Sequence, residues 1–295
     1  MTAQYGGRRM VPATSVEHEG RECVSVLTYN VMRQMHATPD YKPYCDPAVL
    51  TATKRKEQIF QELLSYNADV LCLQEVDDFT LWWVPRLNAA GYDSVYHQRT
   101  GHFDDGLVIA FRRMYFQIFH TLRLDLNDLC NDPSVTANFA AKLQQDNVAL
   151  VVALQPWEQC RFPSALCVSY NSGKTPRFTD GKIRTDICPR PSHLIPFPKG
   201  DPYDSVHVRG DREAKLVHFE VFDSAYAQYY NGGEPDFTYS DHVFTGTVDY
   251  IFYSKKVPNP RRQHHWLPNQ TFSSDHVALM AKIAFRAEEL AVAWN

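Results

Sequence analysis

The sequence has no long hydrophobic run and no excess of positive charge. No stretch reaches the roughly 18 apolar residues that a transmembrane helix needs, so we expect no membrane span. Lys and Arg total 30 against 34 Asp and Glu, which gives a formal net charge of −4. No bulk positive field therefore draws the chain to nucleic acid, and any contact with RNA is expected to be local.

The cysteines lack paired spacing. There are seven, an odd number, and Cys72 lies inside an apolar strand-like run. This usage favours reduced thiols and an intracellular location. The amino-terminal extension, residues 1–22, has Arg8 and Arg9 but no acidic residue before Glu17, a weak feature of organellar presequences. Mitochondrial and cytoplasmic locations are both left open.

What the sequence does contain is enough apolar material for one large domain. Hydrophobic residues make up 44% and charged residues 22% of the 295 residues, as in globular proteins. We assign this domain to residues 23–286, followed by a tail at 287–295. Within it, residues from about 173 to 215 are rich in proline and lack periodicity, which indicates an insertion. A long irregular segment of this kind is usually functional or bound to a partner.

Apolar patterning predicts a mixed α/β (α+β) domain. Strands are expected over 23–29, 68–76, 92–97, 106–111, 147–154, 165–168, 217–226, 247–254 and 277–285, and helices over 46–66 and 79–90. In the first helix, Lys54, Arg55 and Lys56 are expected opposite the apolar face. Strands alternate with helices early in the sequence and follow one another directly later. This order favours two stacked sheets flanked by helices.

Several predicted strands end at polar residues, namely Asn30, Glu75, Asp249 and the pair Asp275 and His276. A buried carboxylate is costly unless it binds a metal or accepts hydrogen bonds, so these residues are candidates for one convergent site. Each also has an ordinary structural interpretation. Asn30 is equally a turn former, Asp249 a strand cap and His276 a structural histidine.

The order of these residues, with their context, resembles one family. The segments that carry the resemblance are VLTYNVM, ADVLCLQEVDDF, GYDSVYHQRTG, DDGLVIAFRR, FTGTVDYIFYS and SSDHVAL, between about Val24 and Phe285. They are similar to the endonuclease/exonuclease/phosphatase superfamily, in the deadenylase-like branch that includes nocturnin and the Angel proteins. The resemblance implies a DNase I-like four-layer sandwich of two mostly antiparallel sheets and flanking helices.

The resemblance also implies roles for the polar residues. Glu75 would bind Mg²⁺ with help from Asn30, and Asp275 would lie near the metal. His276, oriented by Asp249, would contact the scissile phosphate and stabilise its growing charge. A water would then attack in line.

Two motifs of the family, Asn-Thr-His-Leu and Gly-Asp-Phe-Asn, are not intact here. If residues 166–172 (LCVSYNS) match the second motif, Asn171 is retained and Ser169 replaces the Asp that activates water, while one strand–helix unit is missing. If they match the first, the Asp must come from the insertion, where Asp201 and Asp211 are the candidates. A serine hydroxyl does not replace a carboxylate base near neutral pH.

Three functions follow, and all are carried forward. The leading hypothesis is a catalytically inactive nuclease-fold protein that serves as a structural or binding subunit of a larger assembly. The alternative is an active Mg²⁺-dependent phosphodiesterase of the 3′–5′ exoribonuclease type. The third is an RNA-binding module, for which the candidate contacts are Arg99, His102 and Arg112, with Trp82 and Trp83.

Overall fold

A computed structural model describes residues 23–131, 137, 140, 144–157, 166–171, 204–208, 214–218, 222–226, 237–254, 267–268 and 272–284. The predicted extension at 1–22, the tail at 287–295 and most of the insertion lie outside these residues. The division of the chain into these segments therefore stays a prediction.

A five-stranded sheet forms the centre of the fold. Its strands lie in the order β14 (Leu279–Ala284), β1 (Cys23–Asn30), β2 (Val70–Val76), β4 (Gly106–Arg112) and β3 (Tyr92–Gln98). Strands β1 and β2 are parallel and are joined by the helix α1 (Ala52–Tyr66), whereas the other neighbours are antiparallel. Parallel neighbours end at the same edge of a sheet, so Asn30 and the end of β2 meet there.

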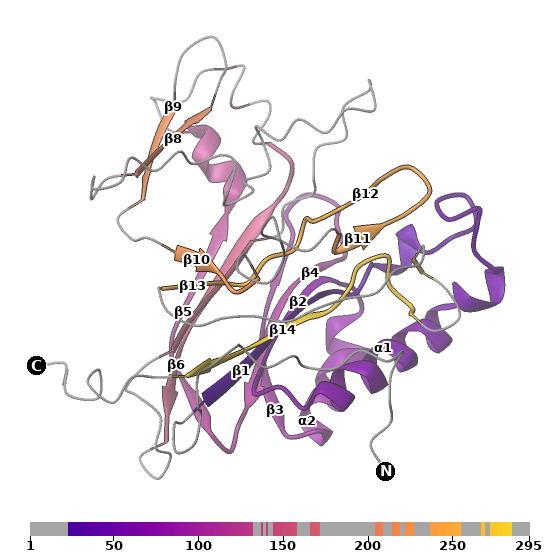
Figure 1. Cartoon of the computed structure of the whole chain (residues 1–295), viewed down its shortest axis with the longest axis horizontal. Helices are drawn as coiled ribbons and strands as arrows, with labels where there is room; N and C mark the ends of the chain where they lie inside the picture. Colours follow the sequence, from indigo (N-terminus) through magenta and orange to yellow (C-terminus); the bar gives the residue numbers. More distant parts are fainter. Residues whose placement is uncertain are drawn as a thin grey trace, which may run out of the picture.

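A second sheet packs against one face of the first. It contains β5 (Phe116–Asp125), β6 (Val148–Pro156) and β7 (Leu166–Asn171), paired antiparallel in this order. Buried apolar side chains of both sheets form one cluster between them, including Val26, Val70, Ile109, Phe111, Val148, Leu150 and Val152. Figure 1 shows β5 and β6 on one side of the central sheet and α1 and α2 on the other.

The helical layer covers the opposite face of the central sheet. The predicted helix over 46–66 is a 3-10 turn, η2 (Pro47–Val49), followed by α1, which ends where Asn67 takes a left-handed backbone with φ +49°. The predicted helix over 79–90 is a π-helical turn, η3 (Phe79–Trp83), followed by α2 (Val84–Ala89). Both helices pack on the sheet through a second cluster that includes Ile59, Leu63, Leu71, Trp83, Leu87 and Val108.

One expectation for α1 was wrong. Arg55 and Lys56 were predicted opposite the apolar face, yet their exposed fractions are 1% and 8%. They are buried because the loops that leave the sheet fold over this side of α1, where the carboxylate of Asp77 lies 2.8 Å from the Lys56 ammonium. Lys54 alone of the three is exposed.

Short strands fill the later part of the chain. They pair as β8 (Asp204–Val208) with β9 (Ala214–His218), β10 (Phe222–Ser224) with β13 (Phe252–Ser254), and β11 (Tyr239–Ser240) with β12 (Thr245–Gly246). The β8–β9 pair reaches into the predicted insertion, which composition did not indicate. The strand predicted over 247–254 is realised only in β13, so Asp249 precedes a strand and does not end one.

The prediction of a mixed α/β domain of stacked, mostly antiparallel sheets is confirmed. Two 3-10 turns, η1 (Gln34–His36) and η4 (Leu126–Asn131), complete the elements. η4 contacts β6 of the second sheet. β7 pairs antiparallel with β6, the strand before it, a connection that requires no intervening helix.

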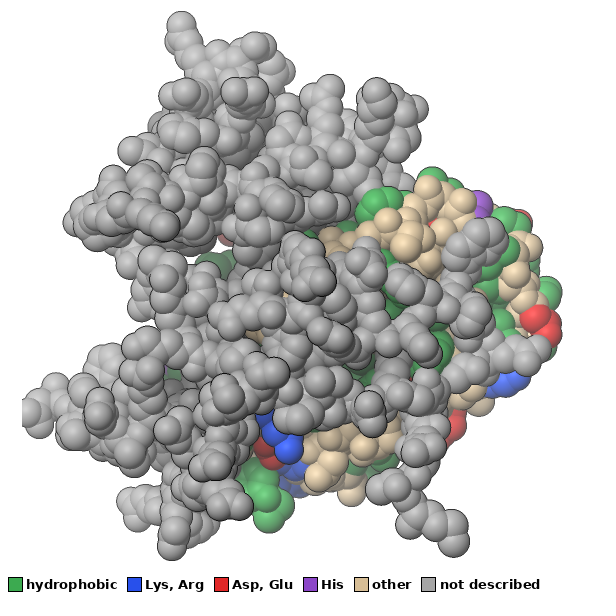
Figure 2. Space-filling model, viewed as in Figure 1, with side chains coloured by type: hydrophobic (Ala, Val, Ile, Leu, Met, Phe, Trp, Pro, Cys, Tyr) green, Lys and Arg blue, Asp and Glu red, His purple; other side chains and the backbone are tan. Residues whose placement is uncertain are grey.

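Within the described part of the chain, no helix has the length and apolar character to cross a membrane. In Figure 2 blue and red side chains are scattered over the coloured part of the face and do not gather into a basic patch.

Candidate functional site

Glu75 lies at an irregularity in β2. The pairing of β2 with β4 shifts register between Leu73 and Val76, and Glu75 has a left-handed backbone with φ +54°. A β-bulge bends the strand and re-aims a side chain, and a positive φ at a residue with a long side chain is characteristic of functional sites. The bulge turns Glu75 toward Asn30 at the end of the neighbouring strand.

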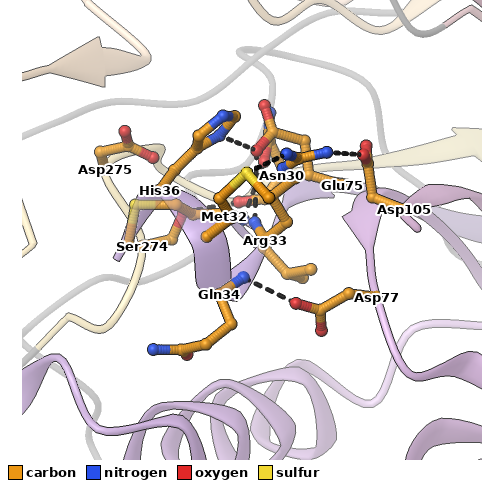
Figure 3. A network of polar contacts seen from close by, with 12 residues as sticks. Asn30, Met32, Arg33, Gln34, His36, Glu75, Asp77, Asp105, Ser274 and Asp275 are labelled. Carbon is orange, nitrogen blue, oxygen red and sulfur yellow. Dashed lines mark hydrogen bonds and ion pairs between the residues drawn. The ribbon is translucent and has the colours of Figure 1, made fainter. Parts of the chain in front are cut away.

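The carboxylate of Glu75 and the amide of Asn30 are bonded to each other. Asn30 Nδ2 donates to Glu75 Oε1 over 3.2 Å, and the Asn30 oxygen accepts the Met32 N–H at 2.8 Å. The Arg33 N–H donates to Glu75 Oε2 over 3.2 Å. Figure 3 shows Asn30, Arg33 and Glu75 close together. Two of the predicted site residues are thus in contact, and both are held by the turn that follows β1.

His36 is a member of this group that the sequence did not reveal. Its Nδ1 lies 3.1 Å from Glu75 Oε2, and both side chains are 18% exposed. The imidazole also packs against the ring of Tyr41 with 5.5 Å between centroids. No strand end marks His36, because it lies on the 3-10 turn η1; only its closeness to Asn30 in the sequence is a signal.

The second predicted pair is also formed. His276 Nδ1 lies 2.7 Å from Asp249 Oδ2, and both side chains are buried. Burial favours the neutral imidazole, but the charge and hydrogen bond of Asp249 outweigh burial and, with Asp275 and Glu75, raise the pKa of His276 to about 9. A protonated imidazole at this place can donate a hydrogen bond to a phosphate oxygen.

Ser274 and Arg55 join the two pairs. The Ser274 hydroxyl donates to the carbonyl of Asn30 at 2.6 Å and accepts the N–H of His276 at 3.1 Å. Arg55 donates to the carbonyls of Met32 and Ser273, one on each side of the site. The Glu75 and His276 pairs are therefore parts of one hydrogen-bonded assembly.

Asp275 forms an ion pair within the chain. Its Oδ2 accepts from the Lys42 ammonium over 2.6 Å, and the same ammonium lies 3.6 Å from Asp241 Oδ2. Lys42 is 3% exposed. A buried ammonium at this distance neutralises Asp275, so this carboxylate is occupied by a cation of the chain itself.

The side chains proposed to contact RNA have mixed environments. The Arg99 guanidinium is buried on the ring of Phe103, 3.7 Å from its centroid, and donates to the carbonyls of Gln145 and Asp146. Arg112 donates to the carbonyl of Ala90. Those contacts are structural. His102 is exposed.

Both candidate tryptophans pack in the helical layer. Trp83 is 1% exposed and Trp82 is partly buried against the same cluster. Among these five candidates, only His102 is fully presented to solvent in the described part of the chain.

The segment that should carry the water-activating group is visible only as backbone. In β7, Ser169 pairs with Val151 and Asn171 with Ala149. The alternative carboxylates Asp201 and Asp211 lie outside the described residues. Whether either approaches Glu75 stays a prediction.

The polar groups can be tested for a fit to Mg²⁺. This ion binds through one or two carboxylates and keeps several waters. Glu75, partly exposed and hydrogen-bonded to Asn30, fits such a site, whereas Asp275 on Lys42 does not. In the described residues, no group of at least three His, Cys, Asp or Glu side chains is arranged to hold an ion. Glu75 and Asn30 therefore fit a single ion with a largely aqueous shell.

The chain is similar to several known proteins. The sequence profile of the Endonuclease/Exonuclease/phosphatase family matches residues 27–159. The chain is 26% identical over 346 aligned positions to Carbon catabolite repressor protein 4 homolog 1 of Arabidopsis thaliana, covering 88% of this chain and 57% of the relative. It is 29% identical to the CCR4-Not complex 3′-5′-exoribonuclease subunit Ccr4 of Candida albicans, covering 92% of this chain and 42% of the relative.

Solved structures show the same fold. The crystal structure of ANGEL2, a 2′,3′-cyclic phosphatase, aligns with a TM-score of 0.65 and 23% identity over 89% of this chain and 95% of the other. The human Nocturnin catalytic domain aligns with a TM-score of 0.55 and 20% identity over 92% of this chain and 100% of the other.

Residues 27–159 therefore carry the sequence pattern of the endonuclease/exonuclease/phosphatase family. Within it, the relatives place the chain in the deadenylase-like branch, as the sequence predicted. It spans 57% of the length of the Arabidopsis relative.

Proposed function

We propose that this chain binds a phosphate group of a nucleic acid at His276 and Glu75 without cleaving it at a rate typical of the family, and that it acts as a subunit of a larger assembly. The observation that carries the proposal is an asymmetry of the site. The His276–Asp249 pair and the Glu75–Asn30 pair are intact. The segment that should supply the base reads Ser169-Tyr170-Asn171.

Each retained group has a defined task in binding. The protonated imidazole of His276 offers a hydrogen bond and a positive charge to one phosphate oxygen. Glu75, with Asn30, would hold Mg²⁺, which when bound neutralises part of the negative charge of the phosphate. The carboxylates of Glu75 and Asp275 already have partners in the chain. The segment expected to supply the base has Ser169 in place of the Asp, and a serine hydroxyl is too weak a base near neutral pH.

The test measures binding and cleavage on the same preparation. Purified chain is incubated with Mg²⁺ or Mn²⁺ and two labelled probes, oligo(A) and an oligoribonucleotide that ends in a 2′,3′-cyclic phosphate. We expect binding that is lost in His276→Ala, with no measurable turnover of either probe. Asp104→Asn is a matched control, because this exposed carboxylate pairs only peripherally with Arg33, at 3.5 Å.

The same test decides the alternative function. The relatives include proteins named as 3′-5′-exoribonuclease subunits and a 2′,3′-cyclic phosphatase. Turnover of either probe that Glu75→Gln abolishes would make this chain an active Mg²⁺-dependent phosphodiesterase, with a base from residues such as Asp201 or Asp211. Strong binding that falls steeply with salt but survives His276→Ala would instead favour the RNA-binding module.

An exposed apolar strand supports the subunit role. β5 pairs with β6 alone among the described strands, and Ile118, Phe119, Leu122 and Leu124 on it are 47%, 71%, 44% and 41% exposed. An unpaired edge that carries apolar side chains invites pairing with another chain. Among the relatives, Ccr4 of Saccharomyces cerevisiae is named as a subunit of the CCR4-Not complex.

Charged substitutions on β5 are expected to dissociate the assembly. When the tagged chain is purified from its own cells, a protein partner should co-purify with it in fixed stoichiometry. Phe119→Asp or Leu122→Asp should reduce its yield by at least about tenfold, since apolar residues at an interface centre contribute most of its binding energy. Met114→Asp, which changes an apolar residue 62% exposed and outside β5, should not. Recovery of the wild-type chain alone would contradict the subunit role.

A further inference from the structure

Lys42 is a buried cation between two carboxylates on different segments of the chain. Its ammonium lies 2.6 Å from Asp275 Oδ2 and 3.6 Å from Asp241 Oδ2. It also lies 5.5 Å from the centre of the Tyr239 ring. All three charged side chains are at most 9% exposed, so no bulk water competes for them and the attraction is strong.

Other hydrogen bonds hold the Asp241 carboxylate and the backbone of Asp275. Asp241 accepts the Tyr239 hydroxyl at 2.5 Å, and its Oδ1 accepts the N–H groups of Val243 and Phe244 at 2.9 and 2.8 Å. The carbonyl of Asp275 accepts the Ser240 N–H at 3.0 Å. The carboxylates are therefore held around a cation-sized position, and the residue that fills it is Lys42.

A divalent ion and the ammonium exclude each other from this position. An ion must approach a carboxylate oxygen to about 2.0–2.6 Å. The Lys42 nitrogen already stands at 2.6 Å from Asp275 Oδ2. An ion on the same oxygen would lie within a few ångström of the ammonium in a buried setting, where like charges repel strongly.

We infer that Lys42 is a resident cation of the site. It takes the place of a metal ion beside Asp275 and Asp241, so among the described residues of the site Glu75 is left as the place for divalent metal. Lys42 thereby determines how many divalent ions the site binds. The inference deepens the proposed function, because it concerns the same site and rests on Glu75 as the place of metal binding.

The experiment counts bound Mn²⁺ by electron paramagnetic resonance on the full chain. We expect the wild type to bind no more than one ion. Lys42→Ala uncovers two buried carboxylates, and we expect it to bind one ion more than the wild type. The extra ion should be lost in the double variant Lys42→Ala with Asp275→Asn. The matched control Lys42→Arg keeps a cation there and should leave the count unchanged.

Asp275→Asn alone keeps the inference testable if Lys42→Ala does not fold. It should leave the Mn²⁺ affinity of the chain within about threefold, because Asp275 holds no metal. A loss of at least about tenfold, as expected for removal of a metal ligand, would overturn the inference. Two ions on the wild type, or a folded Lys42→Ala with no extra ion, would also overturn it.

These outcomes are separable from those of the proposed function. The count is made without substrate, so turnover by the wild type would refute the inactive site and leave the role of Lys42 standing. A wrong count would refute the role of Lys42 and leave phosphate binding at His276 standing.

Discussion

The wild type is expected to lose stability as pH rises from about 6.5 to about 9. Asp249→Asn is expected to remove this loss. The pKa of His276 is raised from 6.5 to about 9 in the folded chain. A raised pKa contributes stability that is fully present below the unfolded pKa and is lost as pH rises through the folded pKa. A pKa shift of this size corresponds to roughly 3 kcal/mol of stabilisation of the folded chain by the protonated His276.

The measurement is urea unfolding of wild type and variant at pH 6 and pH 9.5. The difference in unfolding free energy between the two proteins should be larger at pH 6 by about 2–3 kcal/mol, because only there does the wild type gain from a charged His276. Asp125→Asn is the matched control. Asp125 lies 3.0 Å from His97 but is 41% exposed, so its loss should cost less than about 1 kcal/mol. Equal differences at both pH values would contradict the prediction.

Arg55→Met is expected to destabilise the fold by about 3–5 kcal/mol, as removal of one member of a buried charged network does. Arg55 is 1% exposed and donates to the backbone carbonyls of Met32 and Ser273. Methionine fills a similar volume but donates nothing. The two carbonyls would be left unsatisfied, each at a cost of about 1–3 kcal/mol.

Lys54→Met is the control for Arg55, since it makes a similar change one residue earlier on the exposed side of α1. It should change the unfolding free energy by less than about 0.5 kcal/mol. The unfolding free energies of the two variants are compared by chemical denaturation at one pH. A second series is measured in the presence of oligo(A). A loss in Arg55→Met that is no larger than in Lys54→Met would show that the guanidinium does not join the two sides of the site.

The sequence determined the central strands because these depend on local pattern. A buried β-branched run such as that before Asn30 ends where a polar residue can be satisfied. The parallel pairing of β1 and β2 then follows from the helix between them, and it brings Asn30 and Glu75 to one edge. His276 and Asp249 were identified by resemblance, and their contact agrees with it.

Other features were decided only by the tertiary structure. The bulge that turns Glu75 toward Asn30 arises from the register of β2 against β4, which no local pattern in β2 encodes. His36 joins the site through a 3-10 turn and not through a strand end. Helical spacing predicts that Arg55 faces solvent, because it indicates which face of α1 packs on the sheet. It does not indicate that loops cover the other face, where Arg55 donates to the carbonyl of Ser273.

Lys42 shows the same limit most clearly. It lies in a short polar segment whose composition indicates only a loop, more than two hundred positions before Asp275. Its role follows from its burial, because a buried charge must be paired with an opposite charge. In the folded chain Asp275 and Asp241, which come from the carboxyl-terminal part of the sequence, supply these charges. Local pattern determined the strands and the candidate residues, but which charges face each other was decided where distant loops meet over the sheet.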